Sequence, residues 1–196
     1  MLWQRFLNIS NFLATVLTAL GTALAAYAAL KATESSERTA ALQAISQFNS
    51  LITTYSRAGA CIVALDSNHD PAMVEAMLAK TEFIMRAIKI GPTARCRQMQ
   101  ESELTVRMEI TVPRDQSDSI NQQIFNYLNG YEAILLYWYA GAGDKSLICS
   151  EVFYGYNEFV RPFVWMLQQL PNNPSAKSYL RSYPAIVKFM AVTGCI

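Results

Sequence analysis

Recognisable catalytic chemistry is what this sequence lacks most. It contains no P-loop, no dinucleotide-binding glycine pattern, no G-x-S-x-G nucleophile motif and no H-E-x-x-H zinc motif. The only histidine is His69, and it lies in the stretch Ser67–Pro71, whose composition is typical of a loop. Without a motif that indicates a reaction, the sequence predicts no catalytic residue, no cofactor and no metal ligand.

A surplus of charge of either sign is also missing. The 196 residues carry 16 basic and 15 acidic side chains, which gives a formal net charge of +1. All of the acids and every base except Arg5 lie beyond Leu30, so that part of the chain is electrically balanced. General nucleic-acid binders carry a basic surplus that contacts phosphates. We therefore expect no nucleic acid among the partners.

Cysteine is sparse, and its spacing does not indicate a metal site. Cys61, Cys96, Cys149 and Cys195 are far apart, and no C-x-x-C pair occurs, which argues against zinc ligands that are close in sequence. Two interpretations remain open. The even number permits two disulfides if the domain is exported, whereas scattered cysteines in helices are commonly buried thiols.

Charge is completely absent from the stretch Phe6–Leu30. As a helix it extends roughly 37 Å, enough to cross a hydrocarbon core of about 30 Å. We therefore expect residues 1–31 to form a transmembrane anchor and residues 32–196 to form a soluble helical domain. One alternative is a cleaved signal peptide, for which Ala23-Leu24-Ala25 or Ala26-Tyr27-Ala28 supplies a small-residue cleavage site. A buried core helix is the other alternative.

Small residues recur along this stretch at helical spacing. Such rows let transmembrane backbones approach each other closely, so we take them as a candidate helix–helix interface, although alanine-rich spans also show them by chance. The residues are Ala14, Thr18, Thr22 and Ala26 in one row and Gly21, Ala25 and Ala29 in a second row.

Basic residues at the two ends of the predicted anchor indicate its orientation weakly. Arg5 and the amino terminus precede it, and Lys31 and Arg38 follow it. Because basic residues favour the cytoplasmic side, we expect a single-pass membrane protein with a cytoplasmic carboxyl-terminal domain.

Apolar residues at helical spacing predict helices over most of the remaining chain. The pattern runs from Lys31 to Leu65 without a breaker, and Asp70 followed by Pro71 predicts a second helix that ends at Gly91-Pro92. Near its end lie four bases without an acid. They form either a patch for anionic lipid or phosphate or the solvated end of a helix. These bases are Arg86, Lys89, Arg95 and Arg97.

The stretch 104–112 departs from the helical pattern, because apolar and polar residues alternate in it with the period of a strand. No second alternating run is present to pair with it. We expect either a single short strand with an unpaired edge or a helix with a misleading pattern.

An aromatic-rich antiparallel helix hairpin is predicted around the turn Ala140–Gly143. Glu132 is the only charged residue between Asp118 and Asp144, and the hairpin would place it near Glu151. Neighbouring carboxylates raise each other's pKa, as they do in many active sites. A membrane-bound enzyme that uses this pair is therefore an alternative function.

A basic tail follows the hairpin. On a continuous helix the spacing of Lys177, Arg181 and Lys188 places them on one face. We expect these bases to dock against the acidic hairpin, and anionic lipid is the alternative destination.

One pattern runs through the hairpin: Asn129 and Glu132 before the turn, Gly143 and Asp144 in it, and Phe153, Tyr154, Arg161, Pro162 and Trp165 after it. Together with the uncharged span, this pattern resembles bacterial single-pass membrane proteins of unknown function. The resemblance covers about half of the chain. It implies a cytoplasmic helical domain on an anchor and implies no activity.

The sequence therefore predicts an all-α protein, with an N-terminal transmembrane helix, a small helical bundle and a candidate single short strand near 104–112. The expected function is that of a membrane-tethered interaction module, which self-associates or serves as an accessory subunit of a larger membrane assembly. The expected partners are membrane lipid, through residues 6–30, and a second copy or other membrane proteins. An exported soluble helical protein with a cleaved signal peptide is a further alternative.

Overall fold

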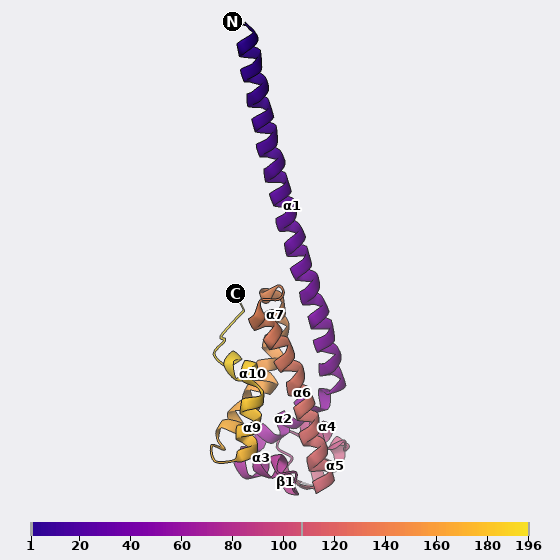
Figure 1. Ribbon diagram of the computed structural model, residues 1–196. Coiled ribbons are helices and arrows are strands. Elements are labelled where there is room, and N and C mark those ends of the chain that lie inside the picture. Colours follow the sequence, from indigo (N-terminus) through magenta and orange to yellow (C-terminus); the bar gives the residue numbers. More distant parts are fainter. Residues whose placement is uncertain (1, 107, 196) are drawn as a thin grey trace.

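The computed structural model describes residues 2–106 and 108–195, and it describes side chains from residue 24 onward except that of residue 106. The most extended element is the helix α1 (Leu2–Thr54). Figure 1 shows α1 projecting far from the other elements, which gather around its carboxyl-terminal part. Residues 24–39 are all exposed, and Ala41 is the first described residue of α1 that is completely buried.

Within the described part of the chain, no helix is both long and apolar enough to cross a membrane. Most of the uncharged run Phe6–Leu30 lies before residue 24, where the structure gives the helical backbone and no side chain. The predicted anchor therefore stays a prediction.

The described chain is mostly helical, as predicted, and it includes a two-stranded sheet. The elements after α1 are, in order, α2 (Ser56–Asn68), α3 (Pro71–Leu78), β1 (Phe83–Arg86), α4 (Ile90–Arg97), α5 (Glu101–Val106), β2 (Glu109–Val112), α6 (Arg114–Ala140), α7 (Lys145–Gly155), the π-helical segment η1 (Tyr156–Val160), α8 (Arg161–Gln168), α9 (Pro174–Ser182) and α10 (Pro184–Phe189).

The helix predicted to run unbroken from Lys31 to Leu65 is interrupted at Tyr55. This residue has φ −105° and ψ 27°, outside the helical region, and α2 leaves the axis of α1 there (Figure 1). The change of direction carries α2 into the bundle, where Ile62 and Leu65 are fully buried. No glycine or proline marks the break, so the apolar pattern alone did not reveal it.

The helix that begins at Pro71 ends at Leu78, so the predicted end at Gly91-Pro92 is wrong. Its start is confirmed, because Asp70 is the N-cap and its Oδ1 accepts a hydrogen bond from Ala72 N–H at 2.9 Å. Gly91-Pro92 instead lies in the first turn of α4. Proline suits a first turn because the backbone N–H groups there have no partner within the helix.

The predicted unpaired strand at 104–112 is also corrected. Residues Leu104–Val106 belong to the helix α5, and only Glu109–Val112 is a strand. This strand, β2, pairs antiparallel with β1, so that Met85 lies opposite Ile110. With four residues, β1 is too short to show an alternating period, so the sequence pattern places it in the preceding helix.

The predicted antiparallel hairpin is present as α6 and α7. Gly141 ends α6 with a φ of 68°, a left-handed conformation that glycine adopts readily. Asp144 caps α7, and its Oδ1 accepts a hydrogen bond from Leu147 N–H at 3.0 Å. The second arm continues through η1 into α8. Pro162, which lacks an N–H, is the second residue of α8, and the π-helical turn before α8 replaces the regular hydrogen-bond pattern.

The carboxyl-terminal helices α9 and α10 pack on the hairpin through apolar side chains. Ile186 and Phe189 are buried. The ring of Phe189 lies edge-on to that of Tyr156, with the two ring centroids 4.8 Å apart. Among the described residues, no ion pair joins the predicted basic tail to an acid. The tail therefore docks where expected, but its bases Lys177, Arg181 and Lys188 stay exposed.

Two disulfides fix segments that are distant in sequence. Cys61 in α2 is bonded to Cys96 in α4, and Cys149 in α7 is bonded to Cys195 after α10. Of the two interpretations of the cysteines, pairing is the one that the structure has.

Candidate interaction site

Glu132, the buried carboxylate of α6, has a structural partner. Glu132 is 8% exposed and accepts hydrogen bonds from the backbone N–H groups of Ala185, at 3.0 Å, and of Ile186, at 2.9 Å. These N–H groups belong to the first turn of α10, which has no intrahelical acceptors for them. Glu132 thus joins α6 to α10. Burial raises the pKa of nearby Tyr139, and the negative charge of Glu132 adds to this.

Glu132 and Glu151 have different partners. Glu151 is exposed, and its Oε1 accepts a hydrogen bond from Asn49 Nδ2 in α1 at 3.0 Å. Neither carboxylate lines any of the pockets described below. The arrangement gives Glu132 a role in docking α10 and Glu151 a role in docking α1, and it supplies no geometric support for a catalytic pair.

The turn between α6 and α7 fits closely against α1. At Gly143 an added Cβ would lie 3.2 Å from the backbone nitrogen of Ala41, so only a residue without a side chain fits there without displacement. Tyr137 donates a hydrogen bond to the carbonyl of Ala142 at 2.6 Å, and Trp138 Nε1 donates to the carbonyl of Lys145 at 2.9 Å. These bonds hold the turn at the end of the bundle from which α1 emerges (Figure 1).

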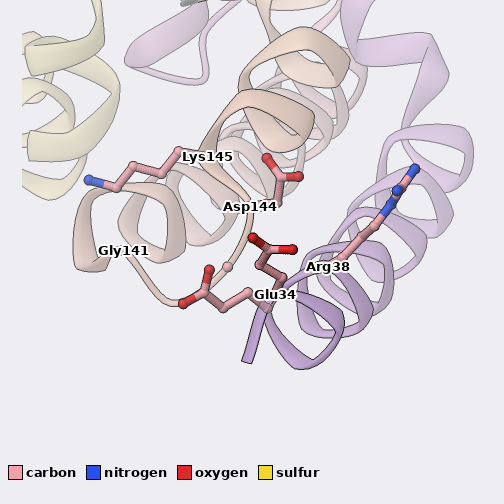
Figure 2. A pocket seen from close by; sticks show the side chains of 7 residues that line it. Glu34, Arg38, Gly141, Asp144 and Lys145 are labelled. Carbon is pink, nitrogen blue, oxygen red and sulfur yellow. The ribbon is translucent and has the colours of Figure 1, made fainter. Parts of the chain in front are cut away.

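A charged cleft of about 500 Å³ lies between this turn and α1. Figure 2 shows Asp144 on the side of the turn that faces α1, and Lys145 extending away from α1. Acidic side chains outnumber basic ones in the cleft. Its lining residues are Glu34, Glu37, Arg38, Gly141, Gly143, Asp144 and Lys145.

Beyond Arg5, the charges of α1 are confined to a short stretch, and they lie on the side of the helix that faces the domain. Between Phe6 and Thr54 the only charged residues are Lys31, Glu34, Glu37 and Arg38. Three of them line the cleft, and Lys31 Nζ lies 2.8 Å from Glu34 Oε2. The opposite side of the exposed helix therefore carries no charge.

An apolar groove follows α1 where it packs on α6. Phe48 of α1 and Tyr131 of α6 make an edge-to-face contact, with their ring centroids 4.9 Å apart, and this contact joins the two helices. Gly130 lies under Leu51, with space for a Cβ 3.6 Å from the Cβ of Leu51. The groove has a volume of about 120 Å³. It is lined by Ala44, Gln47, Phe48, Leu51, Gly130, Ala133, Ile134 and Tyr137.

The single histidine lies at a separate pocket of about 420 Å³, formed where the α2–α3 loop meets α8. His69 adopts a left-handed φ of 48° as the C-cap of α2, so its predicted place in a loop is confirmed. Trp165 contributes an indole that is 52% exposed. The remaining lining residues are Asp70, Pro71, Val74, Met166 and Gln169.

The four bases at 86–97 do not form one patch. Arg86 in β1 pairs with Glu109 at 3.3 Å, and Arg97 donates to the carbonyl of Thr111 at 3.1 Å. Burial lowers the pKa of Arg97, and the neighbouring charge of Arg57 lowers it further. Arg86 and Arg97 thus each bind a residue of strand β2, while Lys89 and Arg95 are exposed.

The predicted interaction residues have different places in the structure. The side chains of Ala14, Thr18, Gly21 and Thr22 lie outside the described residues, whereas Ala25, Ala26 and Ala29 are exposed on α1. Within the described residues, no group of three potential ligands is placed to hold a metal ion.

The groove and the confinement of charge were not recognised in the sequence. One signal was available, because α1 has no charged residue from Thr39 to Thr54 although ten of these 16 residues are exposed. The groove also requires α6, which follows 60 residues later in the chain, and no local pattern reveals that contact.

Comparisons with protein-family models, with curated proteins and with solved structures find no match. The resemblance to bacterial single-pass membrane proteins therefore stays a prediction.

Proposed function

We propose that this protein is a membrane-tethered helical interaction module. The observation that carries the proposal is the continuity of α1, whose uncharged run Phe6–Leu30 leads directly, without a hinge, into the part of the helix that packs on the bundle. An uncharged run of this length is sufficient for a membrane span. The exposed residues 31–39 then hold the bundle close to the membrane surface.

The proposed partners are other membrane helices, in a second copy or in a larger assembly. The rows of small residues in the uncharged run would let a second helix approach closely. Ala25, Ala26 and Ala29, at the end of these rows, contact no part of the bundle that would compete for them, because α1 is exposed there.

The disulfides support a place for the bundle outside the cytoplasm. Disulfides persist in oxidising compartments and are rare where thiol reductants are abundant. We therefore propose that the domain faces an oxidising compartment. This departs from the orientation that Lys31 and Arg38 favour in the sequence, where the difference from Arg5 and the amino terminus is small.

The test is the oligomeric state of the full chain in mild detergent, measured by native mass spectrometry. We expect an oligomer, or a complex with a second membrane protein, that Ala25→Leu weakens. Ala23→Leu is the matched control, because a residue two positions away points about 200° around the helix. A monomer without a co-purifying protein, or equal effects of both substitutions, would contradict the proposal.

Export with cleavage of the first helix is a second candidate function, and the disulfides favour it equally. Cleavage after Ala25 or Ala28 would keep every described residue that packs in the bundle, since residues 24–39 of α1 are all exposed. The mass of the mature protein distinguishes the candidates. An intact amino terminus supports the tether, and loss of about 25 residues supports export.

A further inference from the structure

The groove between α1 and α6 and the uncharged side of α1 form one continuous surface. Gln47 belongs to both, because it lines the groove and lies two residues from Ile45, which packs into the core. Ser36 lies two residues from both Glu34 and Arg38, about 200° around the helix from the charged side. The surface therefore extends along α1 from the proposed anchor to the bundle.

We propose that a second copy of this chain packs its α1 against this surface, so that two copies form a parallel dimer. The proposal rests on the proposed function, since it names the partner and the contact surface of the tethered module. Two anchors that enter the same membrane from the same side necessarily run parallel, and a parallel pair of identical helices has a two-fold axis along its length. Each residue near that axis then faces its own counterpart.

Charge supports a second copy over water as the neighbour of this surface. A surface helix normally carries charged residues on its outer side. From Thr39 to Thr54 α1 has none, and the exposed residues there are Leu, Gln, Ser, Asn and Thr. The charged residues Lys31, Glu34, Glu37 and Arg38 stay on the side of the domain, so pairing of the helices would bury none of them.

The shape of the groove fits the side of a helix. Gly130 and Ala133 keep the α6 wall low, and Leu51 is 41% exposed at the rim. Apolar area of Leu51 and Ala44 that α6 does not cover becomes buried when a second α1 lies alongside. The contact is also continuous with the small-residue rows proposed for the anchor, so one helix face serves both regions.

The experiment is cysteine cross-linking of the full chain in the membrane. Gln47→Cys places a thiol on the proposed axis, and Leu42→Cys is the control. Leu42 is 52% exposed on the same helix but is turned by about 140° from Gln47. After mild oxidation, we expect Gln47→Cys to shift from the mass of one chain to that of two, and we expect Leu42→Cys to stay at one.

A second variant tests the groove itself. Ala133→Arg places a charged side chain in the α6 wall at an exposed position, so the fold is retained, and in combination with Gln47→Cys it should abolish the cross-link. Circular dichroism and the two native disulfides verify that the variant is folded.

The outcomes separate this inference from the proposed function. If native mass spectrometry shows an oligomer but neither cysteine variant cross-links, the groove contact is overturned and association through the anchor remains. A cross-link from Gln47→Cys to a different protein overturns the second copy as the occupant. Equal cross-linking from Leu42→Cys overturns the chosen face, and a monomer in the membrane overturns both proposals.

Discussion

At the scale of the residue, carboxylates accept hydrogen bonds from the free N–H groups in the first turns of three helices, α3, α7 and α10. Asp70 and Asp144 do this for the helices that begin directly after them, α3 and α7. Glu132 accepts from Ala185 and Ile186, more than 50 residues later in the chain. That partner depends on the packing of α10 on α6, which no local pattern encodes.

We expect Glu132→Ala to lower the free energy of unfolding by about 3 kcal/mol, because it leaves two backbone N–H groups of α10 without an acceptor. Urea denaturation of the full chain in detergent measures the change. Glu151→Ala is the matched control, since its carboxylate is exposed and accepts one hydrogen bond, and its effect should stay below about 1 kcal/mol. Similar effects of the two substitutions would contradict the proposed role of Glu132.

A second prediction at this scale concerns Gly155, which precedes the π-helical turn. An added Cβ would collide with the hydroxyl of Tyr131, which is 2% exposed and cannot move into solvent. Alanine ordinarily stabilises a helix relative to glycine by up to about 1 kcal/mol, but the collision should reverse the sign. We expect Gly155→Ala to destabilise the fold by about 1–3 kcal/mol.

Thermal unfolding measures this effect, and the same chain supplies two controls. At Gly59 a Cβ would meet Phe159 at 3.5 Å, an ordinary contact, so Gly59→Ala should be neutral or stabilising. Tyr131→Phe removes the colliding hydroxyl and should restore most of the stability of Gly155→Ala in the double variant. If it restores nothing, the collision is not the cause.

At the scale of the element, the sequence predicted helices well where strong signals bound them. The hairpin was identified from its glycine turn and apolar stripes, and the turn is where it was expected. The errors lie at 55 and at 79–108, where elements of four to eight residues follow each other. Gly91-Pro92 is compatible with the start of a helix as well as with its end. It lies at the start of α4 because of the packing of β1 and α5, which the local sequence does not show.

These short elements make a specific prediction about stability. The disulfide Cys61–Cys96, with a sequence separation of 35, joins α2 to α4. The main neighbours of α4 are α2 and α5. We expect Cys61→Ala/Cys96→Ala to lower the free energy of unfolding by roughly 3–4 kcal/mol, because the cross-link restricts the unfolded chain. Chemical denaturation measures the loss.

The second disulfide serves as the comparison. Cys149→Ala/Cys195→Ala opens a loop of similar length, with a separation of 46, and should cause a loss of similar size. Wild-type protein treated with reductant should lose more than either variant. Equal stability of the oxidised and reduced wild type would show that the disulfides do not restrict the unfolded chain.

At the scale of the whole molecule, the arrangement of charge connects the parts. Three segments follow one another along the single rod of α1 (Figure 1). They are the uncharged run Phe6–Leu30, the charged stretch beside the α6–α7 turn, and the uncharged end that packs on the bundle. The sequence showed the first of these segments directly. It did not show which side of the helix the charges occupy, because this depends on Gly143 and Ala41 bringing the turn against α1.

The side of the membrane on which the bundle lies is the prediction at this scale. If the domain faces an oxidising compartment, all four cysteines should be paired in the cell. Cells are quenched with acid, the protein is denatured, and a heavy maleimide is added before or after reduction. Denaturation is essential because Cys61, Cys96 and Cys149 are at most 2% exposed, and burial alone would protect free thiols.

We expect no added mass without reductant and four adducts with it. The variant Cys61→Ala/Cys96→Ala, which should gain two adducts only after reduction, calibrates the shift. Four adducts without reductant would place the bundle in the cytoplasm, as the basic residues around the predicted anchor suggest, and the disulfides would then not form in the cell.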